Sequence, residues 1–342
     1  AKVDINYEKF VMSFNLNGNV QKKEYTPQEV GLMTYALNTA RSVGAYNEDG
    51  SLMFYQRDND LRHTYLKPFS INERKNTSDD IQSNAIGMSA NIEYRVIPCL
   101  KAGVQFSYGI SNFEERVYFG VKSWYAANLR KEYFPGSDNE GVASNSEMPI
   151  GGELRLNNTK NENYSVRVNL AFNKFLDKEN AHQFQASVIG ELSSTLYTGF
   201  AITKRGYIPE RGMLFDDVNL SDSWGYLEFP NYDGWLKSDA SAKGILTHNL
   251  TRQVGLVGTL FYGYKDAYIF NANMRIDGSN KFGDTSNEKL NPIWSVSGRW
   301  NIHENLLSNK WWINTLALKA SFGYQGNMSA QDSPNLIIQR KG

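Results

Sequence analysis

The chain has 342 residues, with 36 Lys and Arg against 36 Asp and Glu, so its formal net charge at pH 7 is zero. This balance argues against a nucleic-acid-binding protein held by bulk electrostatics. The single cysteine, Cys99, excludes an internal disulfide bond and a metal site built from several thiolates. No apolar run approaches the roughly 18 residues of a membrane-spanning helix.

Aromatic residues make up 13% of this otherwise polar chain. Many of them lie in segments where apolar and polar residues alternate with a period of two, which predicts β-strands. Between 268 and 277, for example, Tyr268, Phe270 and Met274 alternate with polar residues, so one face of the predicted strand is apolar and the other polar. About nine such strands of about nine residues are predicted, the length that crosses a bilayer when tilted. In chain order they are 10–16, 86–94, 100–108, 164–172, 184–192, 254–264, 268–276, 294–302 and 316–324.

The two faces of these strands predict a membrane barrel with a wet lumen. The apolar face, which includes Tyr268, Phe270, Met274, Val296 and Phe322, tends to end in aromatic residues and is expected to meet lipid. The polar face carries charges in mid-strand and is expected to line the lumen. Its predicted lumen-facing residues are Arg167, Glu191, Asn271, Asn273, Arg275, Arg299 and Lys319. A soluble β-sandwich also alternates and is the competing interpretation.

Connection lengths support the barrel. The segments 95–99, 174–182, 265–267 and 303–315 are short, and they alternate with the longer segments 17–85, 109–163, 193–253 and 277–293. Short turns at one end and long loops at the other are typical of outer-membrane barrels. Within the long loops, 114–126 and 152–158 are predicted to form additional hairpins that project beyond the membrane.

The predicted strands do not complete a barrel. Bacterial barrels use an even number of strands and leave no edge, because an open edge in lipid leaves backbone N–H and C=O groups without partners. The fold class is therefore all-β: an antiparallel transmembrane β-barrel, present here as an incomplete segment with long extracellular loops. Residues 1–342 are expected to belong to one barrel domain, without a plug domain or a signal peptide.

Several segments in order resemble SusC/RagA-type TonB-dependent outer-membrane transporters. They are YGYKDAY at 262–268, RIDGSNKFG at 275–283, 292–304 beginning PIWSVSGRW, 316–327 beginning LALKASFGY, and the loop sequence at 38–51. The resemblance implies a parent barrel of roughly 22 strands. It also implies an N-terminal plug and energy supplied through TonB.

The same resemblance implies the cargo and the partners. A SusD-like surface lipoprotein covers such barrels as a lid, the cargo is an oligosaccharide or a peptide, and transporter–lid pairs can form a dimer. The location it implies is the bacterial outer membrane, in contact with lipid and not with nucleic acid. A non-transporting surface barrel or adhesin, whose long loops bind a partner, is the alternative function.

No catalytic arrangement is visible, so the chain is not expected to be an enzyme. The four histidines are far apart in sequence, and no G-x-S-x-G motif is present. Asp49, Asp58, Asp60 and Asp80 lack the ligand spacing of a calcium loop. No cofactor is therefore expected, and Ca²⁺ in the loops or the lid has no support in the sequence.

One loop carries a dense group of aromatic and polar residues. Rings can stack on the C–H faces of sugars, while carboxylates and amides accept or donate hydrogen bonds to hydroxyls. The alternatives are a loop that packs its own small core and a contact with the lid protein. The candidate substrate-binding residues are Asp222, Trp224, Tyr226, Asn231, Tyr232, Asp233 and Trp235.

Overall fold

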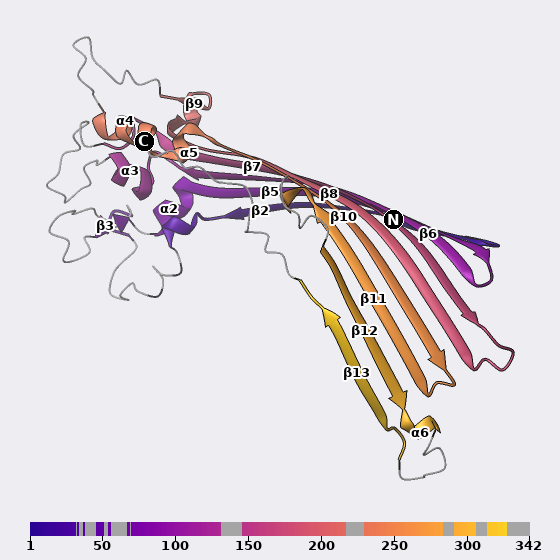
Figure 1. Cartoon of the computed structure of the whole chain (residues 1–342). Helices are drawn as coiled ribbons and strands as arrows, with labels where there is room; N and C mark the ends of the chain where they lie inside the picture. Colours follow the sequence, from indigo (N-terminus) through magenta and orange to yellow (C-terminus); the bar gives the residue numbers. More distant parts are fainter. Residues whose placement is uncertain are drawn as a thin grey trace.

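One antiparallel sheet organises the chain, with the helices α2 to α5 gathered at one end and short turns between strands at the other (Figure 1). The computed structural model describes residues 1–31, 33, 37, 46–50, 54–55, 67–68, 70–130, 146–216, 229–282, 291–305 and 313–326. Within these residues, no helix has the length and apolar character needed to cross a membrane.

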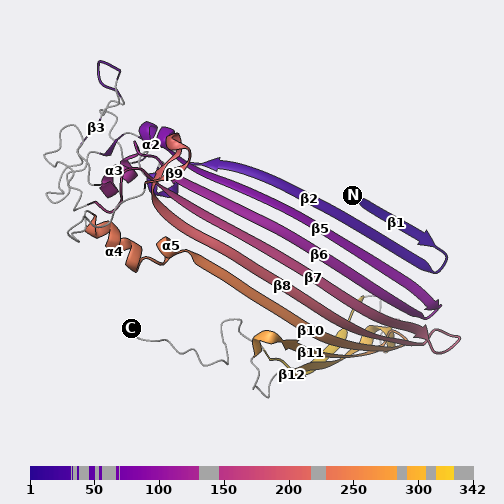
Figure 2. The same ribbon diagram turned by 90° about the horizontal axis from the view of Figure 1, so that it is seen from above.

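The sheet is a meander in which each strand pairs with the next strand of the sheet along the chain, and β2, β5, β6, β7 and β8 lie side by side in Figure 2. Its strands in spatial order are β1 Lys2–Tyr7, β2 Phe10–Tyr25, β5 Thr77–Ile97, β6 Leu100–Phe119, β7 Gly152–Phe175, β8 His182–Ile208, β10 Ile245–Tyr264, β11 Tyr268–Ser279, β12 Asn291–Asn301 and β13 Ala317–Tyr324. The short strand β9, Leu214–Phe215, adds to the end of β8, and β3 Phe54–Tyr55 pairs separately with β4 Lys67–Pro68.

The helices of the described residues are short and flank the sheet ends. They are α2 Ser70–Asn76, α3 Trp124–Arg130, α4 Pro230–Ser238, α5 Ala240–Lys243 and α6 Ile302–Asn305, with the 3-10 turns η1 Gln28–Val30, η3 Pro209–Arg211 and η4 Asn280–Phe282. All except α6 belong to connections at the loop end of the strands. Of these, α2 to α5 gather at the upper left in Figure 1.

All nine predicted strand segments coincide with strands of the sheet, except that Ile302 begins α6 and Leu316 precedes β13. Two expectations need correction. The first is strand length, because β2 and β5 to β8 run for 16 to 27 residues instead of about nine. The second is the pair of additional hairpins, which is wrong. Residues 114–119 and 152–158 are the paired ends of β6 and β7 themselves, and Trp124 begins α3.

The register keeps polar with polar and apolar with apolar across the whole sheet. Arg167 lies opposite Glu191 on one side and Gln105 on the other, whereas the next residue, Val168, lies opposite Gly190 and Val104. Directly opposed residues share a face, and a slip of one residue would invert every side chain. The alternation inferred for each strand is thus shared by all of them.

The apolar face has no protein covering over the described residues. Phe270, Met274, Leu256 and Val188 are between 45% and 51% exposed although they are large hydrophobic residues in mid-strand. A contiguous apolar surface of this extent is far larger than soluble monomers expose. The hydrocarbon of a bilayer is the environment in which it is stable.

At the turn end this face finishes in a row of rings. His182, Tyr264, Tyr268 and Trp300 come from four successive strands, with ring centroids 4.6, 6.4 and 6.1 Å apart. Amphipathic rings collect at the boundary between hydrocarbon and water. The row therefore marks the lower edge of the membrane-facing zone, as the sequence predicted for the strand ends.

In the described part of the chain, fully buried side chains lie at the loop end of the sheet and not in the part of the strands that faces lipid. Among the described residues, the largest fully buried side chains are Phe119, Met148, Glu153, Pro149 and Ser123. All five lie where the connections fold back onto the ends of β6, β7 and β8. The protein core of this segment is thus at the mouth of the wall.

The face assignment predicts opposite outcomes for two neighbouring substitutions in β11. Met274→Arg places a guanidinium in lipid and is expected to cost about 2–4 kcal/mol near the bilayer midplane. Asn273→Arg, on the polar face, is expected to cost less than about 1 kcal/mol. Folding of the full-length protein into phospholipid vesicles measures both, and equal costs would contradict the assigned faces.

Candidate functional site at the loop end of the sheet

A buried carboxylate, Glu153, occupies the centre of the loop end. It lies in β7 on the same face as Arg167, fourteen residues along a strand without an intervening bulge. Only 1% of it is exposed. Its Oε1 accepts hydrogen bonds from Arg155 Nε at 2.8 Å and the Tyr125 hydroxyl at 3.1 Å, and its Oε2 accepts from Arg205 Nε at 2.8 Å.

Arg155 extends this contact to two of the long connections. It donates to Glu29, which belongs to the connection between β2 and β5, and to the Tyr125 hydroxyl at 2.8 Å. Its guanidinium carbon also lies 4.9 Å from the centroid of the Phe119 ring, and Phe119 stacks on Tyr125 at 3.9 Å. The positive charge is thereby held between two anions and two rings.

Arg205 links Glu153 to the third long connection. Its Nη1 donates to the backbone oxygen of Glu147 at 2.8 Å, and its guanidinium carbon lies 4.0 Å from the centroid of the Trp235 ring in α4. We call Glu29, Tyr125, Glu153, Arg155, Arg205 and Trp235 the Glu153 cluster. Three connections far apart in sequence meet in it, so their positions depend on one another.

Close backbone packing borders the cluster on the side away from the turn end of the sheet. Arg130 is 6% exposed and donates to the backbone oxygens of Gly151 and Val121, the latter at 2.5 Å. Gly151 has φ +137°, and a Cβ there would come within 2.5 Å of the Gly206 carbonyl carbon. Glycine is therefore required where the end of β8 crosses this segment.

Burial sets the protonation states around the cluster. Burial, followed by the nearby Glu153 carboxylate, raises the pKa of Tyr125 to about 12, so its hydroxyl stays a hydrogen-bond donor at neutral pH. Burial is the largest single influence on Glu29 and would raise its pKa, but the hydrogen bond from Arg155, a backbone hydrogen bond and the charge of Arg155 together outweigh it, so the pKa is lowered. Glu29 therefore remains charged beside Arg155 at neutral pH.

Asp79, a neighbouring carboxyl on the same face, is less well accommodated. Burial first, and then the charges of Glu115, Asp80 and Glu29, raise its pKa. Its Oδ1 is buried without a hydrogen-bond partner in the described part of the chain. The charged form of Asp79 is thus a source of strain at neutral pH.

The predicted sugar-binding loop is only partly visible. Asp222, Trp224 and Tyr226 lie outside the described residues. In α4, Tyr232 is 8% exposed and stacks on Trp235 at 5.8 Å, while Asp233 pairs with Lys237 at 2.7 Å. Asn231 lies in the same helix. Tyr232 is thus buried, and Trp235, which contacts both Tyr232 and Arg205, is partly exposed. The role of the two rings in sugar binding stays a prediction.

The structure places the seven predicted lumen residues on one face of the sheet, opposite Phe270 and Met274. Several are paired there. Arg167 contacts Glu191 at 3.0 Å, Arg275 contacts Asp277 at 2.6 Å, Arg299 donates to Asn301 at 2.6 Å, and Asn271 donates to Ser297 at 3.5 Å. Asn273 and Lys319 lie in the same rows. That this face lines a lumen remains a prediction from the barrel pattern.

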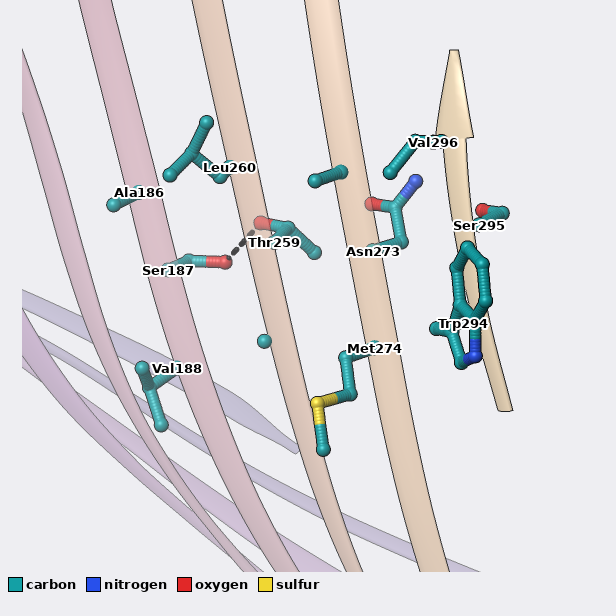
Figure 3. Close-up of a pocket in the computed structure, with 12 residues that line it drawn as sticks. Ala186, Ser187, Val188, Thr259, Leu260, Asn273, Met274, Trp294, Ser295 and Val296 are labelled. Atoms are coloured by element: carbon teal, nitrogen blue, oxygen red, sulfur yellow. Dashed lines mark hydrogen bonds between the residues drawn. The ribbon is translucent and has the colours of Figure 1, made fainter. Parts of the chain in front are cut away.

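A hollow of about 370 Å³ lies on the sheet over β8, β10, β11 and β12 (Figure 3). Eight of its twelve lining residues, among them Val188, Met274 and Trp294, belong to the apolar face. On the polar face Ser187 and Thr259 share a hydrogen bond of 2.7 Å beside it. The hollow is thus a feature of the lipid-facing surface and does not extend the Glu153 cluster.

The described residues do not form a metal-binding site. Among the described residues, no group of three or more His, Cys, Asp or Glu is placed to hold a metal ion. The Glu153 cluster can position loops and present polar groups at a mouth, and its acids are already neutralised by arginines.

Loss of the central carboxylate is expected to release the loops. Glu153→Gln removes the charge that balances Arg155 and Arg205, and breaking a buried ion pair in this way costs about 3–5 kcal/mol. Limited proteolysis of the full-length protein should show faster cleavage in the three connections. Glu162→Gln, which breaks the more accessible pair with Lys160, is the control and should cost less than about 1 kcal/mol. Equal protease resistance in the two variants would contradict the role of Glu153.

The raised pKa of Asp79 predicts a pH-dependent gain. Because the folded pKa lies above the unfolded value, the charged carboxyl destabilises the fold at neutral pH, and this penalty disappears as pH falls below the unfolded pKa of about 3.9. Asp79→Asn should therefore stabilise the protein at pH 7 and have no effect at pH 3.

Asp177 provides the opposite case for the same substitution. Hydrogen bonds from the backbone N–H of His182 and Ala181 lower its pKa, so Asp177→Asn should destabilise at pH 7. Thermal unfolding in detergent at the two pH values measures both variants. A destabilising Asp79→Asn at pH 7 would refute the analysis.

No known family model matches the chain. Two curated proteins of Formosa agariphila are similar in sequence. TonB-dependent receptor P26 is 25% identical over 338 residues, which is 94% of this chain and 29% of that protein. TonB-dependent receptor P39 is 26% identical over 178 residues, or 50% of this chain and 16% of that protein.

Solved structures of the RagAB peptide importer share the fold. The open-open state has a TM-score of 0.64 and 16% identity, and covers 94% of this chain and 31% of that one. The closed-closed state has a TM-score of 0.61 with the same identity and coverage. The chain thus spans less than a third of the length of these proteins.

Fold and sequence agree on one class of protein. The polar and apolar faces, the ring row at the turn end and the long connections at the other end occur together in outer-membrane barrels. They place the chain in the bacterial outer membrane. The comparisons confirm its resemblance to SusC/RagA-type TonB-dependent transporters and the antiparallel β-barrel fold, of which these strands form an open stretch of wall.

Proposed function

We propose that the chain forms part of the wall of an outer-membrane transporter that imports oligosaccharides with energy supplied through TonB. The observation that carries this proposal is the polar face, which continues without interruption from the turn end to the Glu153 cluster. A route for a hydrated cargo needs such a surface along its whole length. An adhesin needs only its outer loops, and its inner face would be free to pack apolar side chains.

The resemblance supplies the other parts of the proposal. The named relatives are TonB-dependent receptors, and RagAB is a peptide importer. We propose by analogy that a SusD-like lipoprotein covers the loop end and that transporter–lid pairs form a dimer. The chain itself needs no catalytic step and no cofactor for this role. A peptide is the competing cargo.

The proposal also assigns the aromatic loop to cargo capture. Trp235 belongs to the Glu153 cluster, and Tyr232 stacks on it; the contact between Arg205 and Trp235 fixes α4 against β8. The partly exposed ring of Trp235, held in this way, can stack on a sugar. Stacking on an aromatic side chain is worth about 1–3 kcal/mol per base in nucleic-acid complexes. The adjacent Asn231 and Asp233 would take the hydroxyls.

Uptake by whole cells tests the function. In a strain that expresses the full-length parent, fluorescent neutral oligosaccharides should accumulate, and accumulation should stop when TonB is deleted. A Trp224→Ala and Trp235→Ala double variant should lose at least about 80% of cargo binding while still assembling with its lid.

Two outcomes separate the alternatives. Accumulation that persists without TonB would contradict energised import, whereas no accumulation of any cargo would favour the adhesin. Unchanged cargo binding by the double variant would leave the transporter in place and reduce the loop to scaffold. Expression at the cell surface, measured by antibody, controls for folding of every variant.

A further inference from the structure

Above the membrane-facing zone, the polar face contains a patch without a single charged residue. We call it the uncharged band. It consists of 24 side chains in four rows across six neighbouring strands, and successive rows are aligned by the register. Its members are the odd-numbered residues of 15–21, 83–89, 107–113, 159–165, 193–199 and 247–253.

The chemistry of the band is that of hydroxyls and amides. Nineteen of the 24 residues are Ser, Thr, Asn, Gln or Tyr, and the other five are Ala85, Phe113 and three glycines. Such side chains both donate and accept hydrogen bonds, which matches a ligand with many hydroxyl groups. Tyr197, 38% exposed, adds a ring.

The opposite face of the same strands shows that this neutrality is local. Its even-numbered residues at the same heights include Lys160, Glu162, Arg252 and His248. The polar face is itself charged just below the band, at Arg167 and Glu191. It is charged again above the band, at Glu115 and at the Glu153 cluster. Composition of the strands therefore does not explain the band.

Two glycines make the centre of the band flat. Gly87 and Gly109 lie side by side, with Asn17 and Asn163 on their outer flanks. A Cβ on Gly87 would come within 2.6 Å of Asn17 Oδ1, and one on Gly109 within 2.8 Å of Asn163 Oδ1. The two amides thus lie over the glycines and present a level polar floor.

One acceptor in the band has no protein partner. Asn161, in the row above Asn163, has a buried Oδ1 without a hydrogen bond from any residue that the structure describes. A buried acceptor left unpaired costs about 1–3 kcal/mol, which a donor from a ligand or water would recover.

The height of the band determines what reaches it. Its lowest row adjoins Tyr108 and Tyr164, the rings with which the apolar face ends on the loop side. Aromatic residues at this position mark the upper edge of the hydrocarbon. The band therefore starts at the outer membrane boundary and rises to the Glu153 cluster, where incoming cargo arrives first.

We infer that the uncharged band is a contact surface for neutral oligosaccharide and that it selects against ionic cargo. A carboxylate, sulfate or ammonium group brought against it would lose water without gaining an opposite charge, whereas a neutral hydroxyl exchanges one hydrogen bond for another. This inference rests on the proposed function. It adds that the cargo is uncharged and that the uncharged band is the surface that selects it.

Binding to the purified full-length transporter with its lid lipoprotein provides the test. The neutral probes are hexasaccharides of glucose (cellohexaose and maltohexaose), xylose and mannose, and the ionic probe of equal length is hexagalacturonate. At least one neutral probe should bind at least about 10-fold more tightly than hexagalacturonate, and a charged peptide of similar mass should bind no better than hexagalacturonate.

Asn163 and Asn158 form a matched pair of substitution sites in β7. Asn163→Asp adds a charge to the band and should weaken the best neutral probe by at least about 5-fold. Asn158→Asp adds the same charge on the opposite face and should leave binding unchanged. Asn163→Lys should raise hexagalacturonate binding, an effect that a merely structural defect would not produce.

Tight binding of hexagalacturonate or of a charged peptide, failure of every neutral probe to bind, or an unaffected Asn163→Asp variant would each overturn the inference. Failure here is distinguishable from failure of the proposed function. TonB-dependent uptake of a peptide would keep the transporter and refute the band, whereas neutral glycan binding without uptake would keep the band and refute transport.

Discussion

The alternation of side chains in paired β-strands is the constraint on which the rest of this structure depends. Once backbone hydrogen bonding fixes the register between neighbours, each residue is committed to one of two faces, and a shift of one position is not tolerated. Every neighbouring pair from β1 to β13 keeps the same phase, so an apolar surface and a polar surface extend across the whole sheet. Lipid and water then each meet the surface suited to them.

Above the lipid, the separation of the sheet into an apolar and a polar face no longer determines stability, and buried ion pairs become the main contacts. Both faces of the strand ends meet water or folded connections, and stability there comes from burial around Glu153 and its two arginines. A fully paired buried charge specifies geometry more than it adds free energy. Because Glu29, Tyr125 and Trp235 come from different connections, a displacement of one is transmitted to the others through a single carboxylate.

The sequence allowed prediction where apolar and polar residues alternate regularly along a strand, and not where a contact joins residues far apart in the chain. Nine strand segments were recognisable because each alternates over about nine residues, and the relative faces of Arg275 and Phe270 followed directly. The strand β1 was missed, although Val3, Ile5 and Tyr7 alternate, because it is only six residues long. The strand ends were taken for loops because alternation fades above the lipid. The pairing of Glu153 with Arg205 depends on a register 52 residues apart, which no local pattern reveals.

The strands continue beyond Tyr108, which marks the outer edge of the hydrocarbon, and this part of the sheet forms a collar that projects from the membrane. Eleven residues separate Tyr108 from Phe119 in β6, which corresponds to about 36 Å of strand, or about 28 Å of height at a tilt of about 40°. The opening therefore stands clear of the lipid head groups, on a stiff sheet instead of on loops. A bulky molecule sliding over the cell surface meets the outside of this collar, and only what comes from above reaches its interior.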